Sequence, residues 1–284
     1  MPPPVARESA TVVVPMDGRA ASCIVCGERR WREIRRGRDI YRPGLPTQYV
    51  LCRCATCGLV AQQPRPGPAE LRAAYAIPYH VFRPAWQVPG WPLWKILRVL
   101  TGGRRLRRLR SHSSPGCLLE VGCGAGDFLL AAQREGWRVH AVEFTEEMVA
   151  LLRRERALDV RQGELVPGLW DEGVFDAVVL WDVLEHVPDP AATLRTAAQY
   201  LRAGGVVLAS FPTADAVRTG QRHGEWWAPL DLPRHLHFLD AGGLARLAGA
   251  AGLTVVDYAT PALDALWCEL ASGWRHAGVM PTAA

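Results

Sequence analysis

The sequence predicts an α/β protein in which a parallel sheet has helices on both faces and is preceded by a small N-terminal β ribbon. Two observations support this. From residue 117 onward, short apolar runs alternate with helical segments, as in a parallel sheet covered by helices. Before that, two Cys-x-x-Cys-Gly segments flank two short extended runs, a pattern typical of a metal-held ribbon. With 284 residues, 49% of them hydrophobic, the chain can bury one α/β core and carry a small accessory module.

Six apolar runs are the expected strands of the parallel sheet. They are residues 117–122, 137–143, 158–162, 175–181, 205–211 and 253–258. The α/β domain is expected to span 117–284, and the ribbon 22–62, with a core of its own. The proline-rich residues 1–21 predict a disordered tail, and 63–116 a helical connector or lid that contains an arginine-rich helix from 94 to 110.

The charge and the hydropathy pattern exclude several classes of protein. The formal net charge of +5 comes almost entirely from arginine, since Lys95 is the only lysine. Together with abundant Ala, Gly and Pro this bias indicates a GC-rich genome, so it does not favour a nucleic-acid partner. No run approaches the ~20 apolar residues of a transmembrane helix, and the first segment lacks the apolar stretch of a signal peptide. We therefore expect a cytoplasmic protein, and no feature sets its oligomeric state.

Four cysteines form two equivalent pairs that predict a structural zinc site. Cys23 and Cys26 precede Gly27, and Cys54 and Cys57 precede Gly58. Four thiolates describe a closed tetrahedral site, and zinc binding would supply the folding energy that so small a ribbon lacks. Four free buried thiols or a redox pair are the alternatives, but a redox Cys-x-x-Cys opens a helix beside a βαβ unit.

A glycine-rich turn after the first expected strand is the most informative segment. Glu120 lies within the strand, and Gly122, Gly124 and Gly126 allow the backbone to approach a ligand closely. Asp127 occupies the position of the last glycine in a dinucleotide-binding loop. A carboxylate there disfavours a pyrophosphate at the helix N-terminus, so a cationic sulfonium ligand fits better.

The second expected strand ends at an acidic residue placed to bind a ribose. Glu143 lies about twenty residues after the glycine turn, where a carboxylate accepts hydrogen bonds from ribose hydroxyls. Phe144 follows and is positioned to lie against a purine. Thr145 is expected to cap the next helix, whereas Glu143 has no expected structural duty.

These segments together resemble the class I S-adenosylmethionine-dependent methyltransferases. The resemblance covers about residues 117–258 and implies a Rossmann-like sheet with S-adenosyl-L-methionine as the cofactor. It also implies that Glu164 contacts the adenine amine and that the loop at Asp182 faces the methionine moiety. The cofactor-binding residues that the motifs and the resemblance indicate are Glu120, Gly122, Gly124, Gly126, Glu143, Phe144, Glu164 and Asp182.

The whole chain is similar to a narrower group, the methyltransferases with an N-terminal zinc ribbon. Cys57-Gly58-Leu59 and Pro233-Arg234-His235-Leu236 carry this similarity. Sugar C-methyltransferases share such a ribbon but continue into a large C-terminal domain. Since this chain does not, a nucleotide-sugar acceptor is not favoured.

Two histidines are the candidate catalytic residues. His235 and His237 alternate in an extended stretch, so both imidazoles are expected on one face, with a pKa range suited to removing a proton from an acceptor. The alternative is that they only hold the loop in place. Asp182, Glu185 and His186 offer a carboxylate–histidine cluster for a divalent cation, although helix entry at Asp189-Pro190 also explains this segment.

The sequence therefore predicts methylation of a small molecule at a hydroxyl oxygen or an activated carbon, in bacterial secondary or envelope metabolism. Tyr75, Tyr79 and His80 are candidates for lining the acceptor pocket. One alternative is an RNA methyltransferase that grips its substrate with the ribbon and the arginine-rich helix. Another is a non-catalytic binding protein that keeps the fold. The Asn/Asp-Pro-Pro-Tyr segment typical of base-amine methylation does not occur after residue 181.

Overall fold

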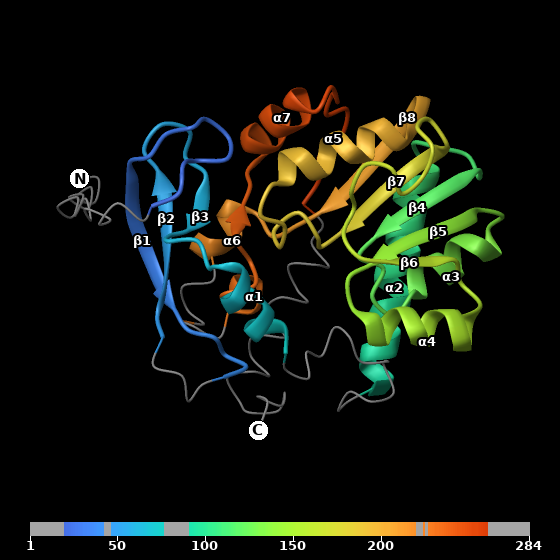
Figure 1. The fold of residues 1–284 in the computed structure, drawn as a ribbon, viewed down its shortest axis with the longest axis horizontal. Helices are drawn as coiled ribbons and strands as arrows, with labels where there is room; N and C mark the ends of the chain where they lie inside the picture. Colours follow the sequence, from blue (N-terminus) through green and yellow to red (C-terminus); the bar gives the residue numbers. More distant parts are fainter. Residues whose placement is uncertain (1–19, 43–46, 77–90, 220–223, 225–226, 261–284) are drawn as a thin grey trace, which may run out of the picture.

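The computed structural model describes residues 20–42, 47–76, 91–219, 224 and 227–260 (Figure 1). The tail expected at residues 1–21 lies almost wholly outside this part of the chain. Two sheets dominate the fold, with the antiparallel ribbon at one end and the parallel sheet at the other. In spatial order the parallel strands are β6 (Val160–Gln162), β5 (Arg138–Glu143), β4 (Cys117–Val121), β7 (Phe175–Trp181) and β8 (Leu201–Ser210).

Helices cover both faces of the parallel sheet, as predicted. One face is covered by α2 (Trp91–Arg110), α3 (Asp127–Arg134) and α4 (Glu146–Arg156), and the other by α5 (Pro190–Tyr200) and α7 (Ala241–Ala250). Alternation along β4 shows why: Leu118 packs in the cluster formed with α2, α3 and α4, whereas Leu119 packs in the cluster formed with α5 and α7. The α/β fold class is confirmed.

The strand predicted at residues 253–258 is absent from the structure. These residues follow α7 as irregular chain, and Val256 is 79% exposed, so the apolar side chains there are not the core of a sheet. Asp257 is held instead by side chains from the end of α2, with its Oδ2 3.0 Å from His112 Nε2 and paired with Arg108. Those polar contacts fix the segment without strand pairing.

The ribbon is an antiparallel sheet that the C-terminal part of the chain completes. Its strands are β1 (Trp31–Gly37), β2 (Tyr49–Cys54) and β3 (Val60–Gln62), and β3 also pairs with β9 (His237–Phe238) through Val60↔Phe238 and Ala61↔His237. The two short extended runs predicted between the cysteine segments therefore correspond to β1 and β2.

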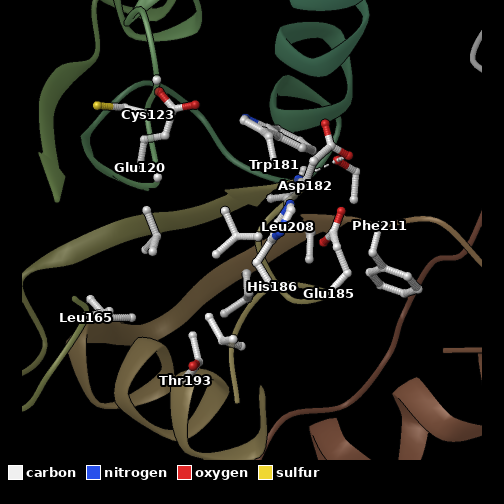
Figure 2. A pocket seen from close by; sticks show the side chains of 18 of the residues that line it. Glu120, Cys123, Leu165, Trp181, Asp182, Glu185, His186, Thr193, Leu208 and Phe211 are labelled. Carbon is white, nitrogen blue, oxygen red and sulfur yellow. Dashed lines mark hydrogen bonds between the residues drawn. The ribbon is translucent and has the colours of Figure 1, made fainter. Parts of the chain in front are cut away.

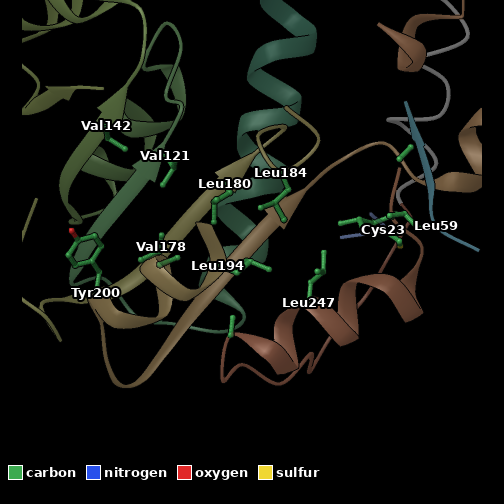
Figure 3. Packing of buried hydrophobic residues seen from close by; sticks show 14 of the residues in the cluster. Cys23, Leu59, Val121, Val142, Val178, Leu180, Leu184, Leu194, Tyr200 and Leu247 are labelled. Carbon is green, nitrogen blue, oxygen red and sulfur yellow. The ribbon is translucent and has the colours of Figure 1, made fainter. Parts of the chain in front are cut away.

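A shared core joins the ribbon to the α/β unit, which corrects the expectation of a separate ribbon core. Cys23 and Leu59 from the ribbon belong to the same buried cluster as Leu239, Leu247 and Leu194 (Figure 3). Apolar area removed from water at this contact stabilises both units together. We therefore expect perturbations of the ribbon to reach the loop before β9.

Three short helices lie between the two sheets: α1 (Pro68–Tyr75), α6 (Ala214–Thr219) and a 3-10 turn at Ala228–Leu230 (Figure 1). Residues 77–90, which include the candidates Tyr79 and His80, lie outside the described residues. Within the part of the chain that is described, no helix is long and apolar enough to cross a bilayer.

Candidate functional site: a cavity at the carboxyl ends of the parallel strands

The glycine turn after β4 adopts backbone conformations that side chains disfavour. Gly122, Gly124 and Gly126 have φ of 67°, 50° and 71°. A Cβ at Gly122 would lie 2.9 Å from Val183, so the turn also packs closely on the loop after β7. Gly122 and Gly124 line the cavity.

Gly126 has a packing role that the sequence did not reveal. It is the N-cap of α3 and is not among the cavity-lining residues. A Cβ there would lie 2.7 Å from Leu152 and 2.9 Å from Leu158. The small residue is therefore needed because α4 and the segment after it pack against the turn.

Glu143 lines the cavity and also has a structural role. The expectation that it has no structural role was therefore wrong. It is only 3% exposed, its Oε2 accepts a hydrogen bond from Gly124 N at 2.9 Å, and its Oε1 accepts one from Thr145 N at 3.0 Å. Thr145 is the N-cap of α4, but its own side chain makes no capping bond. A carboxylate has further lone pairs, so both ribose hydroxyls can still bind it.

Glu120 is buried beneath the glycine turn. It is 3% exposed, and burial raises its pKa well above the usual range, although the Arg105 charge opposes this shift. Its Oε2 has no hydrogen-bond partner in the structure. An orphaned buried carboxyl oxygen beside a ligand-binding turn marks a place where a bound polar group would be stabilised.

The remaining predicted cofactor residues surround the same cavity, which has a volume of about 3700 Å³. Phe144 is 58% exposed and available for stacking, and Glu164 lines the wall near it. Asp182 follows β7 with φ of 58°, accepts a hydrogen bond from Ser210 Oγ at 2.8 Å, and pairs with Arg105 of α2 (Figure 2). Arg105 also lies over the Trp181 ring, 5.0 Å from its centre.

The cavity continues from the glycine turn to a buried cluster at the end nearest the ribbon. Figure 2 shows Glu185 and His186 projecting beside Asp182 and Trp181. Tyr75 from α1 and His235 from the loop before β9 join them, and the rings of His186 and His235 meet edge to face with centres 4.6 Å apart. One wall of the cavity therefore comes from the region between the two sheets.

His235 is oriented as a proton acceptor. Its Nδ1 lies 2.7 Å from the carbonyl oxygen of Pro229, which can only accept, so Nδ1 carries the proton and Nε2 has a free lone pair. Burial lowers the pKa of His235, with Asp231 and the Pro229 carbonyl opposing the shift. The imidazole is thus neutral at physiological pH. Nε2 lies 4.0 Å from Glu185 Oε1 and 3.9 Å from Asp231 Oδ2.

His237 differs from His235 in its surroundings. It is 1% exposed, its Nε2 donates to the Val187 carbonyl at 3.1 Å, and it is not among the residues that line the cavity. Burial lowers its pKa to about 3, with the Arg65 charge acting in the same direction. The two imidazoles therefore do not share one face toward the cavity, and His237 pins the loop to the segment after β7.

Glu185, His186 and His235 could also hold a cation. One ligand atom from each lies within 4.8 Å of the others, and both carboxylate oxygens of Glu185 lack a partner. Asp182, which the sequence grouped with Glu185 and His186, is not part of this set. Burial raises the pKa of Glu185 well above its usual range, with Asp182 adding to the effect. The Asp189-Pro190 helix entry is confirmed, since Asp189 accepts from Ala192 N at 2.9 Å.

The four predicted zinc ligands converge on one point in the ribbon. Cys23 Sγ lies 3.4 Å from Cys57 Sγ, and Cys26 Sγ lies 3.6 Å from Cys54 Sγ. These distances are close to the sulfur–sulfur distance of about 3.8 Å expected when four sulfurs surround zinc tetrahedrally with zinc–sulfur bonds of about 2.3 Å. The turns are equivalent: Gly27 N donates to Cys23 O, and Gly58 N donates to Cys54 O. Cys52 is buried outside the set.

Sequence reasoning missed Arg105 and the ion pairs around Arg234. Arg105 belongs to a run of arginines in α2, where composition does not say which one faces a ligand. Arg234 is part of the segment Pro233-Arg234-His235-Leu236, which is similar to the zinc-ribbon methyltransferases, so its place in that segment could have indicated a role. Its partner Asp39 is 195 residues away in the chain, and no local pattern connects the two.

Comparison with known proteins identifies the family to which the chain belongs. A family model described as a methyltransferase domain matches residues 94–258, more than half of the chain, so the chain belongs to this family. The match begins at residue 94, inside α2, and ends at residue 258.

The relatives include several ubiquinone biosynthesis O-methyltransferases. The protein from Methylocella silvestris is 29% identical over 56% of this chain and 65% of its own length, and the one from Xanthomonas campestris is 39% identical over 34% and 43%. This chain thus spans between 43% and 65% of the length of these two relatives. Among solved structures, a methyltransferase from Thermotoga maritima has a TM-score of 0.48 at 20% identity and covers 61% of this chain and 80% of its own.

Proposed function

We propose that this protein transfers a methyl group from S-adenosyl-L-methionine to a small-molecule acceptor, at a hydroxyl oxygen or an activated carbon. The single observation that carries the proposal is a continuous cavity that joins the glycine turn to the buried histidine cluster. A cofactor at one end and an acceptor at the other would be brought together without water between them. Relatives named O-methyltransferases support the hydroxyl acceptor.

Each end of the cofactor has a matching group. Glu143 accepts the ribose hydroxyls, Phe144 stacks on the adenine and Glu164 accepts from its amine. The methionine end lies near Asp182 and Arg105, whose opposite charges match the amino and carboxylate groups of that moiety. The backbone at Gly122 and Gly124 lets the ligand approach closely, because no Cβ intervenes.

His235 acts as the base in the proposed reaction. The acceptor hydroxyl gives its proton to His235 Nε2 as an oxygen lone pair forms a bond to the methyl carbon. The carbon–sulfur bond breaks and its electrons go to the sulfonium, which leaves S-adenosylhomocysteine. Alignment of acceptor, methyl carbon and sulfur supplies most of the rate, and the base adds roughly 10²–10⁴-fold. His237, which the sequence also indicated, holds the loop.

We propose that the four cysteines bind one structural zinc ion. The convergence of four thiols from two equivalent turns supports this assignment, and a set of four thiolates leaves no open coordination position for chemistry. Zinc would supply folding energy to the ribbon, and no step of methyl transfer passes through it.

The proposed setting is the bacterial cytoplasm, in secondary or envelope metabolism. Two competing functions are tested in the same experiments. Titration of the purified protein with S-adenosylmethionine, followed by detection of S-adenosylhomocysteine over a panel of phenolic and other hydroxyl acceptors, separates an enzyme from a non-catalytic binding protein. Tight RNA binding with a steep dependence on salt would instead favour an RNA methyltransferase. Loss of turnover with EDTA and recovery with Mg²⁺ would replace His235 as base by a cation at Glu185, His186 and His235.

A further inference from the structure

Arg234 is a fully buried charge at the junction of three chain segments. It is 0% exposed. Its Nη2 lies 2.9 Å from Asp39 Oδ1 and 2.8 Å from Asp231 Oδ1, its Nη1 donates to the Ala74 carbonyl at 3.0 Å, and its guanidinium lies over the Tyr41 ring. One side chain thereby holds three segments together: the turn after β1 that contains Asp39, helix α1, and the loop before β9.

The backbone of Arg234 and its neighbours meets the histidine cluster. Its carbonyl oxygen lies 3.1 Å from His186 Nδ1, and the same nitrogen lies 2.8 Å from the hydroxyl of Tyr75. The carbonyl oxygen can only accept, so this contact requires a proton on Nδ1 of His186, and we infer that tautomer here. His235 N donates to Asp231 O at 3.0 Å, so the residue after Arg234 is fixed by the carboxylate residue that the arginine binds.

These contacts form a closed circuit. The Arg234 side chain binds the carbonyl of Ala74, the next residue Tyr75 contacts His186, and His186 contacts the Arg234 carbonyl. One charge therefore sets the position of both partners of a single imidazole nitrogen. The cofactor half of the cavity, at the glycine turn and Glu143, takes no part in this circuit.

A buried ion pair is a weak source of net stability, because desolvation of the charges offsets their attraction. What a guanidinium adds is geometry, since its planar fork holds several acceptors at fixed angles. Asp39 is positioned for the same purpose, with its Oδ1 accepting from Tyr41 N at 3.0 Å and its Oδ2 from Arg42 at 3.0 Å. An apolar residue would fill the space without fixing the loop.

We propose that Arg234, with Asp39, is a positioning residue that fixes the ring orientation and the Nδ1–H tautomer of His186, and the facing imidazole of His235, in the acceptor half of the cavity. The proposal rests on the proposed function for its purpose, but its geometric content is independent of any acceptor. It also gives the ribbon a role in the site, because Asp39 follows the first ribbon strand.

The test is the nitrogen spectrum of the histidine rings in protein labelled with ¹⁵N-histidine, with His186 assigned by its loss in His186→Gln. The wild type should show His186 as the Nδ1–H tautomer. Arg234→Met and Asp39→Asn should give a mixture of tautomers, and Arg234→Lys should restore it in part. The dissociation constant for S-adenosylhomocysteine should stay within about twofold, because the cofactor half is separate. With a known acceptor, kcat should fall roughly tenfold or more.

Arg35→Met is the matched control. Arg35 also joins the ribbon to the α/β unit, but it does so by donating to the backbone carbonyl oxygens of Val217, at 2.9 Å, and of Gly224. It should leave the His186 signal unchanged. A wild-type His186 protonated at Nε2, or a folded Arg234→Met or Asp39→Asn protein with an unchanged His186 tautomer, would overturn the proposal. Failure of the wild type to bind cofactor would refute the proposed function alone.

Discussion

Replacing Glu143 by alanine tests both the cofactor site and the structural role of Glu143. Both carboxylate oxygens already accept backbone hydrogen bonds, from Gly124 N and Thr145 N, so the change leaves two partly buried N–H groups without these partners. At about 1–3 kcal/mol for each, the free energy of unfolding should fall by about 2–6 kcal/mol. Two lost ribose hydrogen bonds, at about 1.5–3 kcal/mol each, should weaken cofactor binding roughly 10²–10⁴-fold.

The assay combines calorimetry with S-adenosylhomocysteine and chemical denaturation of the same preparations. Glu143→Gln keeps one acceptor oxygen but turns the other into a donor facing an N–H, so it should lie between wild type and alanine in both measurements. Glu155→Ala, at the exposed end of the same helix α4, is the control and should change neither. A folded Glu143→Ala protein with wild-type cofactor affinity would refute the site.

Further predictions follow from the ribbon, the histidines and the glycine turn. Purified protein should contain about one zinc per chain, and zinc-free wild-type protein would contradict this. The Cys26→Ser protein should lose the zinc. It should also show faster amide exchange at residues 231–238, because β3 of the ribbon pairs with β9. His235→Ala should lower kcat roughly 10²–10⁴-fold with little change in cofactor affinity, and near-normal turnover would make it structural. Burial lowers the pKa of His237 to about 3, so between that value and 6.5 the unfolded state binds a proton that the folded state lacks, and stability falls as pH falls. His237→Gln should reduce that slope by about 1.2 kcal/mol per pH unit in denaturation at about pH 5 and pH 6, whereas an unchanged slope would refute the assignment. Gly126→Val should lower the melting temperature, since its side chain meets Leu152, and an unchanged melting temperature would argue against tight packing there.

Local patterns predicted most of the fold because each recurs within a few residues. The strand and turn around Gly122, the helix entry at Asp189-Pro190 and the two cysteine pairs all follow from short-range rules of glycine conformation, capping and metal-ligand spacing. The run at 253–258 satisfied the same rules for a strand but found no pairing partner in the described part of the chain. An apolar run alone does not ensure a neighbouring strand.

The site was predictable where its residues follow strands and not where distant segments meet. Glu143 was found because a strand end has a known direction, yet its bonds to Gly124 and Thr145 required the folded turn. His235 and His237 looked equivalent in sequence, and only tertiary contacts separate the residue in the cavity from the one that holds the loop. The Asp39–Arg234 pair joins segments 195 residues apart, beyond any pattern of spacing.

The central claim is that the cavity at the carboxyl ends of β4, β5 and β7 binds S-adenosyl-L-methionine for methyl transfer. Isothermal titration of the zinc-loaded full chain with S-adenosylmethionine tests it most directly. We expect saturable binding of one cofactor per chain, and we expect Gly124→Val to lose it because a branched side chain would occupy the turn at a φ of 50°. Folded wild-type protein that shows neither heat of binding nor thermal stabilisation by the cofactor would contradict it.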